Sequence, residues 1–280
     1  MKIGSLNIEL LSEGKFEIFN DGHINRSLGE ANPAESAGSH SAITGINPVL
    51  VQQDENNILL DAGLGWGLDA GSSYTGVSNV RTNLAIFGLS PEDITHVILS
   101  HLHYDHALGC SFTDRDSVTR ATFPNATYYL HKEEWAYALS TATGSPSLPG
   151  AGYQLDEFYR LMADRRVQLL SGETTDVLEG ITLVQTGGHT PGHHIVFMQS
   201  EGEHACYPGE LIPSSLRLNH YDTHRFDYDP IQAKQEKIRL LRKVYQEQAI
   251  LLFYHSRHAQ SGRLIKDRDK QYVLTNIPGH

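Results

Sequence analysis

The segment His-Leu-His-Tyr-Asp-His at residues 101–106 constrains this chain more than any other feature. It follows the run 95–100, which is short, apolar and partly β-branched and therefore predicts a buried strand. The motif is thus expected where a strand ends and the chain turns, and not on a helix. Three imidazoles and a carboxylate packed this closely would be costly to bury without a shared partner. The segment therefore predicts a metal site.

The spacing within this motif suggests two ions. His101 and His103 are two residues apart in extended chain, so their side chains point the same way and can share one metal. Asp105 and His106 lie beyond the turn and are free to hold a second ion. Histidine together with carboxylate suits zinc or a similar divalent metal.

Three further strand ends carry metal-capable side chains. His189 follows an apolar run and lies in the turn Gly-Gly-His-Thr-Pro-Gly at 187–192, whose glycines and proline allow a tight bend. Glu210 follows a short strand-like segment, and His255 ends another buried run. Four strand ends with this chemistry form one pattern and predict one site.

With these motifs the chain resembles the metallo-β-lactamase superfamily, and within it most closely the quorum-quenching N-acyl homoserine lactonases. The resemblance covers about residues 45 to 260. It rests on five segments in the family's order: L-L-D-A-G at 59–63, H-L-H-Y-D-H at 101–106, G-H-T-P-G-H at 188–193, G-E at 209–210 and F-Y-H at 253–255.

The resemblance implies an α/β chain folded as an αββα four-layer sandwich, with the site at one edge of the sheets. It also implies a small-molecule ester or lactone substrate. The cofactor would be two divalent ions, zinc first, with iron, manganese or cobalt as alternatives. The implied ligands of the first metal are His101, His103 and His189; those of the second are Asp105, His106 and His255, with Glu210 bridging the two.

The implied reaction is hydrolysis by hydroxide held between the metals. A metal lowers the pKa of bound water from about 15.7 to about 7, so hydroxide would be available at neutral pH. Asp105 could orient this hydroxide or carry its proton, which makes Asp105 and Glu210 the candidate catalytic residues. No serine or cysteine nucleophile is required.

The chain departs from the family pattern at three positions. The bridging acid is usually aspartate, but here it is Glu210. Known lactonases carry a tyrosine three residues further on, where this chain has Pro213. Tyr104, Tyr221 or Tyr228 would have to contact the substrate in its place, or no residue replaces it. The last histidine is often followed by aspartate, whereas Ser256 stands here, which leaves His258 as a rival to His255.

Other histidines have weaker signals. His193, within the second motif, is expected to fix the turn or to support a ligand through a hydrogen bond. The histidines without a motif are expected at the surface or in packing; they are His40, His131, His194, His204, His220, His224 and His280.

The composition is typical of a globular enzyme and disfavours some classes of partner. The 22 basic and 33 acidic residues give a formal charge of −11, which disfavours nucleic acid and anionic membranes. The two cysteines do not form a disulfide framework, although Cys206 lies near Glu210 in sequence and could sense oxidants. No apolar signal or membrane-spanning segment is present, so a cytoplasmic location is the default expectation. No linker divides the chain, which predicts one domain over residues 1–280.

Periodicity predicts alternating strands and helices. Helices are expected at 79–88, 132–139, 155–164 and 230–248, the last with Pro230 in its first turn and Ile231, Ile238, Leu241 and Val244 on one side. The stretches 21–45 and 140–152 lack strong periodicity and are candidate loops. In the lactonases that the chain resembles, such loops wall the substrate site or support a homodimer.

Other functions remain open at this point. The same hydroxide could attack an organophosphate triester or an aryl ester. Glutathione-thioester hydrolysis is disfavoured, since no C-terminal basic cluster is evident, and an RNA-processing nuclease conflicts with the acidic charge. A non-catalytic metal-containing sensor is the alternative from a different class; it would be expected to lack a ligand, and every expected position is filled.

Overall fold

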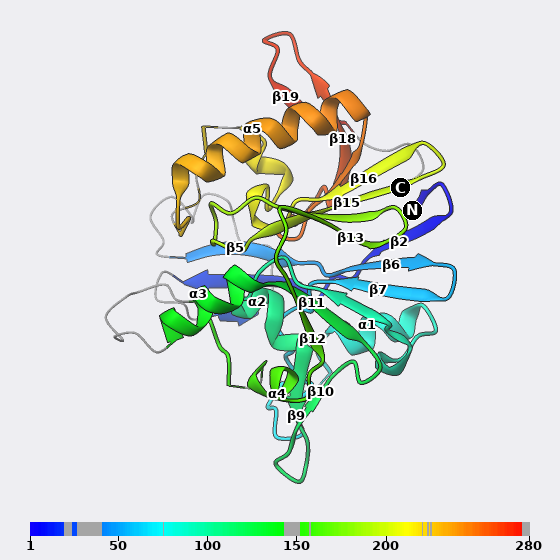
Figure 1. The fold of residues 1–280 in the computed structure, drawn as a ribbon, viewed down its shortest axis with the longest axis vertical. Coiled ribbons are helices and arrows are strands. Elements are labelled where there is room, and N and C mark those ends of the chain that lie inside the picture. Colours follow the sequence, from blue (N-terminus) through cyan, green and yellow to red (C-terminus); the bar gives the residue numbers. More distant parts are fainter. Residues whose placement is uncertain are drawn as a thin grey trace.

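Two seven-stranded sheets lie face to face, with helices on both outer sides (Figure 1). The computed structural model describes residues 1–19, 24–26, 41–74, 76–142, 152–156, 158–219, 221–222, 224 and 226–275.

The sheet of the N-terminal half begins with antiparallel strands and continues with parallel ones. Its order is β1 (Lys2–Ile3), β2 (Leu6–Leu10), β6 (Val49–Gln53), β7 (Asn56–Leu60), β8 (His96–Ile98), β11 (Thr127–His131) and β12 (Val167–Leu170). Parallel neighbours need a crossover connection. These crossovers contain α1 (Val80–Ile86), α3 (Lys132–Ala142) and α4 (Phe158–Ala163).

The second sheet runs through the C-terminal half. Its order is β13 (Thr174–Leu178), β14 (Ile181–Gln185), β15 (His194–Ser200), β16 (Glu203–Tyr207), β17 (Ile250–Leu252), β18 (Ser261–Lys266) and β19 (Tyr272–Thr275). Strands β16 and β17 are parallel, and α5 (Pro230–Glu247) lies in the connection between them. Smaller sheets contain β3 (Gly14–Phe19), β4 (Ile24–Arg26) and β5 (Ser41–Ile46), and β9 (Ser111–Thr113) with β10 (Thr119–Ala121).

Three buried clusters separate four layers. The central cluster joins the facing sides of both sheets, with Val51 from one sheet and Val196 from the other. A second cluster packs the N-terminal sheet against its helices through residues such as Leu84. A third packs the C-terminal sheet against α5 through Leu241 and Val244. This arrangement confirms the predicted αββα sandwich. Its physical reason is that each sheet must bury its apolar faces against another layer.

Helix α5 begins where the sequence predicted, at Pro230. The Asp229 side chain caps it by accepting hydrogen bonds from the backbone N–H groups of Ile231 (3.0 Å) and Gln232 (2.9 Å). The expected apolar side was wrong at Ile231, which is 71% exposed. Ile231 lies in the first turn of α5, and the buried side begins two residues later at Ala233.

Several sequence expectations can be compared with these elements. The stretch 21–45 was expected to be a loop, but β4 and most of β5 lie within it; its remaining residues, and most of 140–152, lie outside the described residues.

Cys110 and Cys206 are free thiols and fully buried, which argues against a role in sensing oxidants. Among the described residues, no helix is both long and apolar enough to cross a membrane. A single domain over 1–280 stays a prediction.

Candidate metal centre

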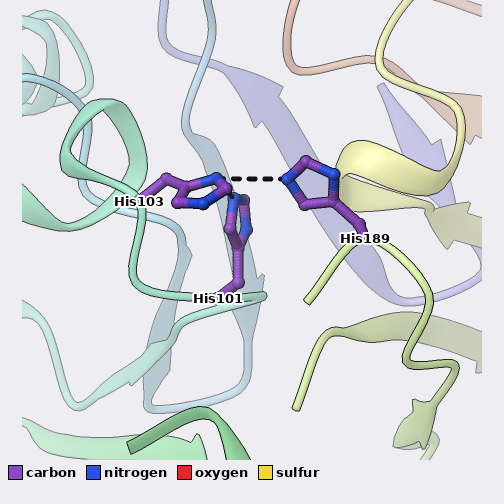
Figure 2. A group of neighbouring side chains, drawn as sticks. All are labelled: His101, His103 and His189. Atoms are coloured by element: carbon purple, nitrogen blue, oxygen red, sulfur yellow. Dashed lines mark hydrogen bonds between the residues drawn. The ribbon is translucent and has the colours of Figure 1, made fainter. Parts of the chain in front are cut away.

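Three imidazoles converge at the edge of the two sheets, as Figure 2 shows for His101, His103 and His189. Nδ1 of His103 lies 3.0 Å from Nε2 of His101 and 3.1 Å from Nε2 of His189. Burial and the neighbouring imidazoles hold the pKa of His101 and of His103 well below the usual range, so both rings are neutral. Neutral imidazole is the form that binds a metal.

The Nδ1 atoms of His101 and His189 are held by hydrogen bonds on the side away from the centre. The Ser100 hydroxyl donates to Asp61 Oδ2 and so accepts from Nδ1 of His101, at 2.7 and 3.0 Å respectively. Nδ1 of His189 donates to Asp227 Oδ1 at 3.0 Å. Each contact fixes the proton on Nδ1 and leaves the Nε2 lone pair facing the centre. One proton on His103 cannot satisfy both Nε2 atoms, so the group fits a cation.

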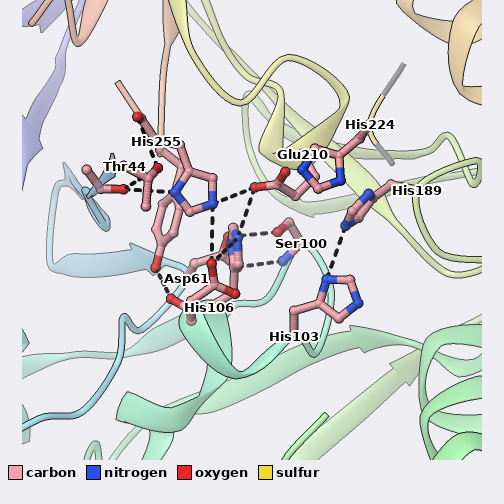
Figure 3. A network of polar contacts seen from close by, with 12 residues as sticks. Thr44, Asp61, Ser100, His103, His106, His189, Glu210, His224 and His255 are labelled. Carbon is pink, nitrogen blue, oxygen red and sulfur yellow. Dashed lines mark hydrogen bonds and ion pairs between the residues drawn. The ribbon is translucent and has the colours of Figure 1, made fainter. Parts of the chain in front are cut away.

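A second group lies beside the first and contains carboxylates (Figure 3). Nε2 of His255 lies 2.6 Å from Glu210 Oε1 and 3.4 Å from Asp105 Oδ2. Nε2 of His106 lies 3.3 Å from Glu210 Oε1 and 4.0 Å from Asp105 Oδ2. Nδ1 of His255 donates to the carbonyl oxygen of Gly45 at 2.8 Å, so its Nε2 is the atom that faces the carboxylates.

The charges in this second group favour a cation. Burial opposes a charged His106, but Asp105 and Asp61 outweigh it and raise the pKa of His106 to about 10. Burial would raise the pKa of Glu210, but His255 and the hydrogen bonds from His106 and His255 hold it well below its usual range. The carboxylates thus keep protons on two imidazoles whose Nε2 atoms could instead bind a metal. The residues present fit a second divalent ion.

The local chain path differs from the expectation for the first motif. The motif was predicted to lie off any helix, but residues Tyr104–Ala107 form the one-turn helix α2. His103 is its N-cap, and its carbonyl oxygen accepts from the backbone N–H groups of His106 (2.9 Å) and Ala107 (3.1 Å). Because this turn begins right after extended residues, it directs Asp105 and His106 back towards the strand end.

Asp61, in the 59–63 segment, positions residues of both groups. Its carboxylate accepts from Ser100 N (2.7 Å), Ser100 Oγ (2.7 Å), His106 Nδ1 (2.7 Å) and the Tyr207 hydroxyl (2.5 Å). These bonds fix the His106 proton on Nδ1 and direct its Nε2 to Glu210. This role of Asp61 was not predicted from the sequence; an acid directly after an apolar strand was the available signal.

His193 has the supporting role that was expected of it. Its Nε2 accepts from the backbone N–H of Glu210 at 3.1 Å, and its Nδ1 bonds the Thr186 hydroxyl at 2.7 Å. Gly209 allows this contact, since it has a φ of +50° and an added Cβ would lie 2.6 Å from His193 Nε2.

Glu134 joins loops around the first group. Its carboxylate accepts from Leu102 N (2.9 Å), the Thr190 hydroxyl (2.5 Å) and the Tyr153 hydroxyl (3.0 Å). It thereby connects the turn at His101 and His103 to the turn at His189. No motif marked this residue, because its partners come from three separate segments.

The structure distinguishes between the remaining candidates for the last metal ligand and for the substrate contact. His255 lies in the second group, while His258 is exposed outside it. Tyr221 and Tyr228 are 69% and 60% exposed. Tyr104 is partly buried, and burial together with Asp105 and Glu210 raises the pKa of its phenol.

His224 was expected in packing or at the surface, but it lies next to the site. His224, His189 and Asp227 form a third set of side chains that could share an ion. The rings of His224 and His189 have centroids 5.4 Å apart. His224 had no motif in sequence, because its position depends on how the loop before α5 folds back.

A family model described as the metallo-beta-lactamase superfamily matches residues 43–255, which is most of the chain. The chain belongs to the metallo-beta-lactamase superfamily. The predicted resemblance is confirmed, and the chain is a hydrolase of this superfamily with histidine and carboxylate groups that could bind metal.

Known members of the superfamily are similar in sequence and in fold. The N-acyl homoserine lactonase AiiA of Bacillus thuringiensis subsp. kurstaki is 28% identical over 222 residues, which cover 74% of this chain and 79% of the lactonase. A probable metal-dependent hydrolase from Staphylococcus aureus matches with a TM-score of 0.76 and 25% identity, over 99% of both chains. The dizinc quorum-quenching lactonase AidC matches with a TM-score of 0.73 and 20% identity, over 99% of this chain and 97% of AidC.

Proposed function

We propose that this protein is a two-metal hydrolase that opens small lactones, with N-acyl homoserine lactones as the first candidates. The observation that carries the proposal is the adjacency of the two ligand groups. One group offers three imidazole nitrogens, and the other offers two imidazoles with the carboxylates of Asp105 and Glu210. Support for this substrate class comes from the sequence similarity to the N-acyl homoserine lactonase AiiA.

The ligand chemistry favours zinc, with iron, manganese and cobalt as alternatives, because imidazole and carboxylate together suit these ions. When bound, the ions would lower the pKa of a water molecule and polarise the substrate carbonyl. His101, His103 and His189 would hold one ion, and Asp105, His106 and His255 the other. We propose Glu210 as the bridging ligand; its carboxylate contacts His106 and His255.

The chain's own residues supply the remaining steps. The Asp105 carboxylate lies in the second group and is placed to accept a proton from the attacking water. Tyr104 follows His103 directly, and its raised pKa keeps the phenol protonated so that it can donate a hydrogen bond to a carbonyl oxygen. We propose Tyr104 as the substrate contact in preference to Tyr221 and Tyr228, which are largely exposed.

A specific observation keeps aryl esters and phosphotriesters as a second candidate. Pro213 stands where the resembling lactonases have a tyrosine, and it has no donor for a carbonyl oxygen. Its carbonyl oxygen instead accepts from the backbone N–H of His255 at 2.8 Å. Without a phenol at this position, carbonyl placement must differ, which favours substrates that depend less on it.

Rates on a substrate panel test the proposal. The metal-loaded protein should be compared on N-acyl homoserine lactones, other lactones, an aryl ester, a phosphotriester, a glutathione thioester and a β-lactam. Lactone opening should release one acid per turnover and should be lost after chelation. Efficient cleavage of the phosphotriester with every lactone intact would overturn the lactonase proposal. No hydrolysis of any of these by a fully loaded protein would favour the sensor alternative.

A further inference from the structure

A small pocket with a cavity volume of about 20 Å³, open to solvent, lies beside the metal centre. Glu210 and His224 form the part of its wall nearest the centre, and Figure 3 shows these two side chains together. Helix α5 and the 3-10 helix Ser215–Arg217 supply other lining residues. A ligand in this pocket therefore lies next to the proposed bridging carboxylate.

Three basic side chains line the pocket although they are far apart in sequence. Lys234 and Lys237 are three residues apart on α5 and so share one side of the helix, and Arg217 comes from the preceding turn. No C-terminal basic cluster was evident from the sequence, because only the fold brings these residues together.

Lys237 is unusual because it is buried. Only 4% of its surface is exposed, and burial lowers its pKa to about 8, so the ammonium is still charged at neutral pH. Its Nζ donates to the backbone carbonyl oxygen of Asp222 at 3.3 Å. An ammonium has three donors, so this long bond leaves capacity for a ligand. A buried cation in a pocket wall is costly unless an anion compensates it.

Three carboxylates, Glu210, Asp222 and Asp227, line the pocket beside the three cations. Asp227 is already bonded through both oxygens, to His189 Nδ1 at 3.0 Å and to His224 N at 2.8 Å. Glu210 is bonded to His255 at 2.6 Å. These hydrogen bonds leave the carboxylates charged, so without metal the three acids balance Arg217, Lys234 and Lys237. Divalent ions bound at the centre would offset the charge of Glu210, and the pocket would then carry a net positive charge.

We propose that this pocket binds an oxyanion, a carboxylate or a phosphate group, on the acyl part of the substrate. The substrate class is then an ester or lactone with a negative charge remote from the reacting carbonyl. Arg217 can pair with two oxygens of such a group, while the two lysines supply point charges. This inference rests on the proposed ester hydrolysis.

Three esters with the same leaving group test the pocket. They are the 4-nitrophenyl esters of butyrate (neutral), succinate (carboxylate) and 3-phosphonopropionate (phosphonate), with spontaneous hydrolysis subtracted. We expect at least one charged ester to exceed the butyrate ester in kcat/KM by about tenfold. The better of the two charged esters identifies the anion. No preference for either charged ester would overturn the proposal.

Variants test whether the lysines of the pocket cause the preference for a charged ester. Lys234→Gln and Lys237→Met should each reduce the ratio of charged to neutral kcat/KM towards one. Met has nearly the length of Lys and suits a buried position, so folding should survive. The matched control is Lys243→Gln, on the same helix but outside the pocket, where Lys243 pairs with Glu247. A ratio that stays unchanged in both pocket variants would overturn the proposal.

A binding readout keeps this inference separate from the proposed function. Calorimetry with succinate should show binding to the metal-loaded wild-type protein and to Lys243→Gln, and weaker binding to Lys237→Met. If no ester is hydrolysed but this difference is present, the hydrolase proposal fails and the anion pocket stands. Equal binding to all three proteins would overturn the pocket.

Discussion

At the scale of single residues, the site depends on side chains that hold the ligands as much as on the ligands. Asp61 accepts four hydrogen bonds and fixes both the tautomer and the direction of His106. His193 holds the backbone of Glu210 in the same way. Such supporting contacts place the ligand atoms where a metal can bind.

We predict that Asp61→Asn weakens metal binding by roughly 10- to 100-fold. The amide NH₂ group would face donors that now bond a carboxylate, so His106 would lose its fixed orientation. Chelator competition measures the affinity. Asp54→Asn, in the turn between β6 and β7, is the control and should bind metal like the wild type. Unchanged affinity in Asp61→Asn would show that these hydrogen bonds do not position the ligand.

Glu210 gives the second prediction. Glu210→Gln should weaken metal binding and remove most hydrolysis, since a neutral amide is a poorer ligand and cannot balance cationic charge. Glu210→Asp should be milder and should alter metal preference. Metal content and rates should be compared with those of Glu201→Gln in an exposed turn. If the Gln variant matches this control in both, Glu210 lies outside the functional site.

At the scale of elements, short turns place the ligands where strands end. The one-turn helix α2 brings Asp105 and His106 back to the centre, and the 3-10 helix Gly209–Leu211 presents Glu210. Gly209 is the critical residue of the latter, because it combines a left-handed backbone with close contact to His193.

We predict that Gly209→Ala lowers both stability and metal affinity. A left-handed alanine costs about 1 kcal/mol, and its Cβ would also displace His193. Gly202→Ala separates the two effects: Gly202 has a φ of +79° but no atom within 4 Å of an added Cβ. Thermal unfolding and metal affinity should show a stability loss in both variants and an affinity loss in Gly209→Ala alone. Equal metal affinity in both would contradict the role given to Gly209.

Sequence reasoning located the elements whose signals are local. The run before His101 predicted β8, and Pro230 predicted the start of α5, because apolar periodicity and helix caps depend on neighbouring residues. It missed α2, because a single turn of four residues, Tyr104–Ala107, is too short to show a helical period. It also missed Asp61, Glu134 and the pocket that Lys237 lines, because their partners come from distant segments. The ligand motifs were found because metal chemistry restricts which residues can stand there.

At the scale of the whole molecule, buried Glu13 connects the small sheet to the N-terminal half. Its carboxylate accepts from Leu64 N at 2.9 Å and from Val80 N at 3.0 Å. Burial outweighs these two bonds and raises its pKa to about 7. The folded state therefore binds this proton more tightly than the unfolded chain, whose Glu13 has the ordinary value of 4.5.

Stability should consequently fall as pH rises from about 4.5 through about 7, by up to about 3 kcal/mol from this group. Glu13→Gln cannot titrate and should remove that part of the pH dependence. Urea unfolding of both proteins at pH 5 and pH 8, with the same metal loading, measures it. An identical pH dependence in the two proteins would contradict the raised pKa.

The most direct test of the account is the metal content of the protein after reconstitution and removal of free ions. Elemental analysis should find about two divalent ions per chain, as expected for a two-metal site. His255→Ala, which removes a ligand from the second group, should bind close to one ion. A wild-type protein that holds one ion or none after full reconstitution would contradict the two-metal centre.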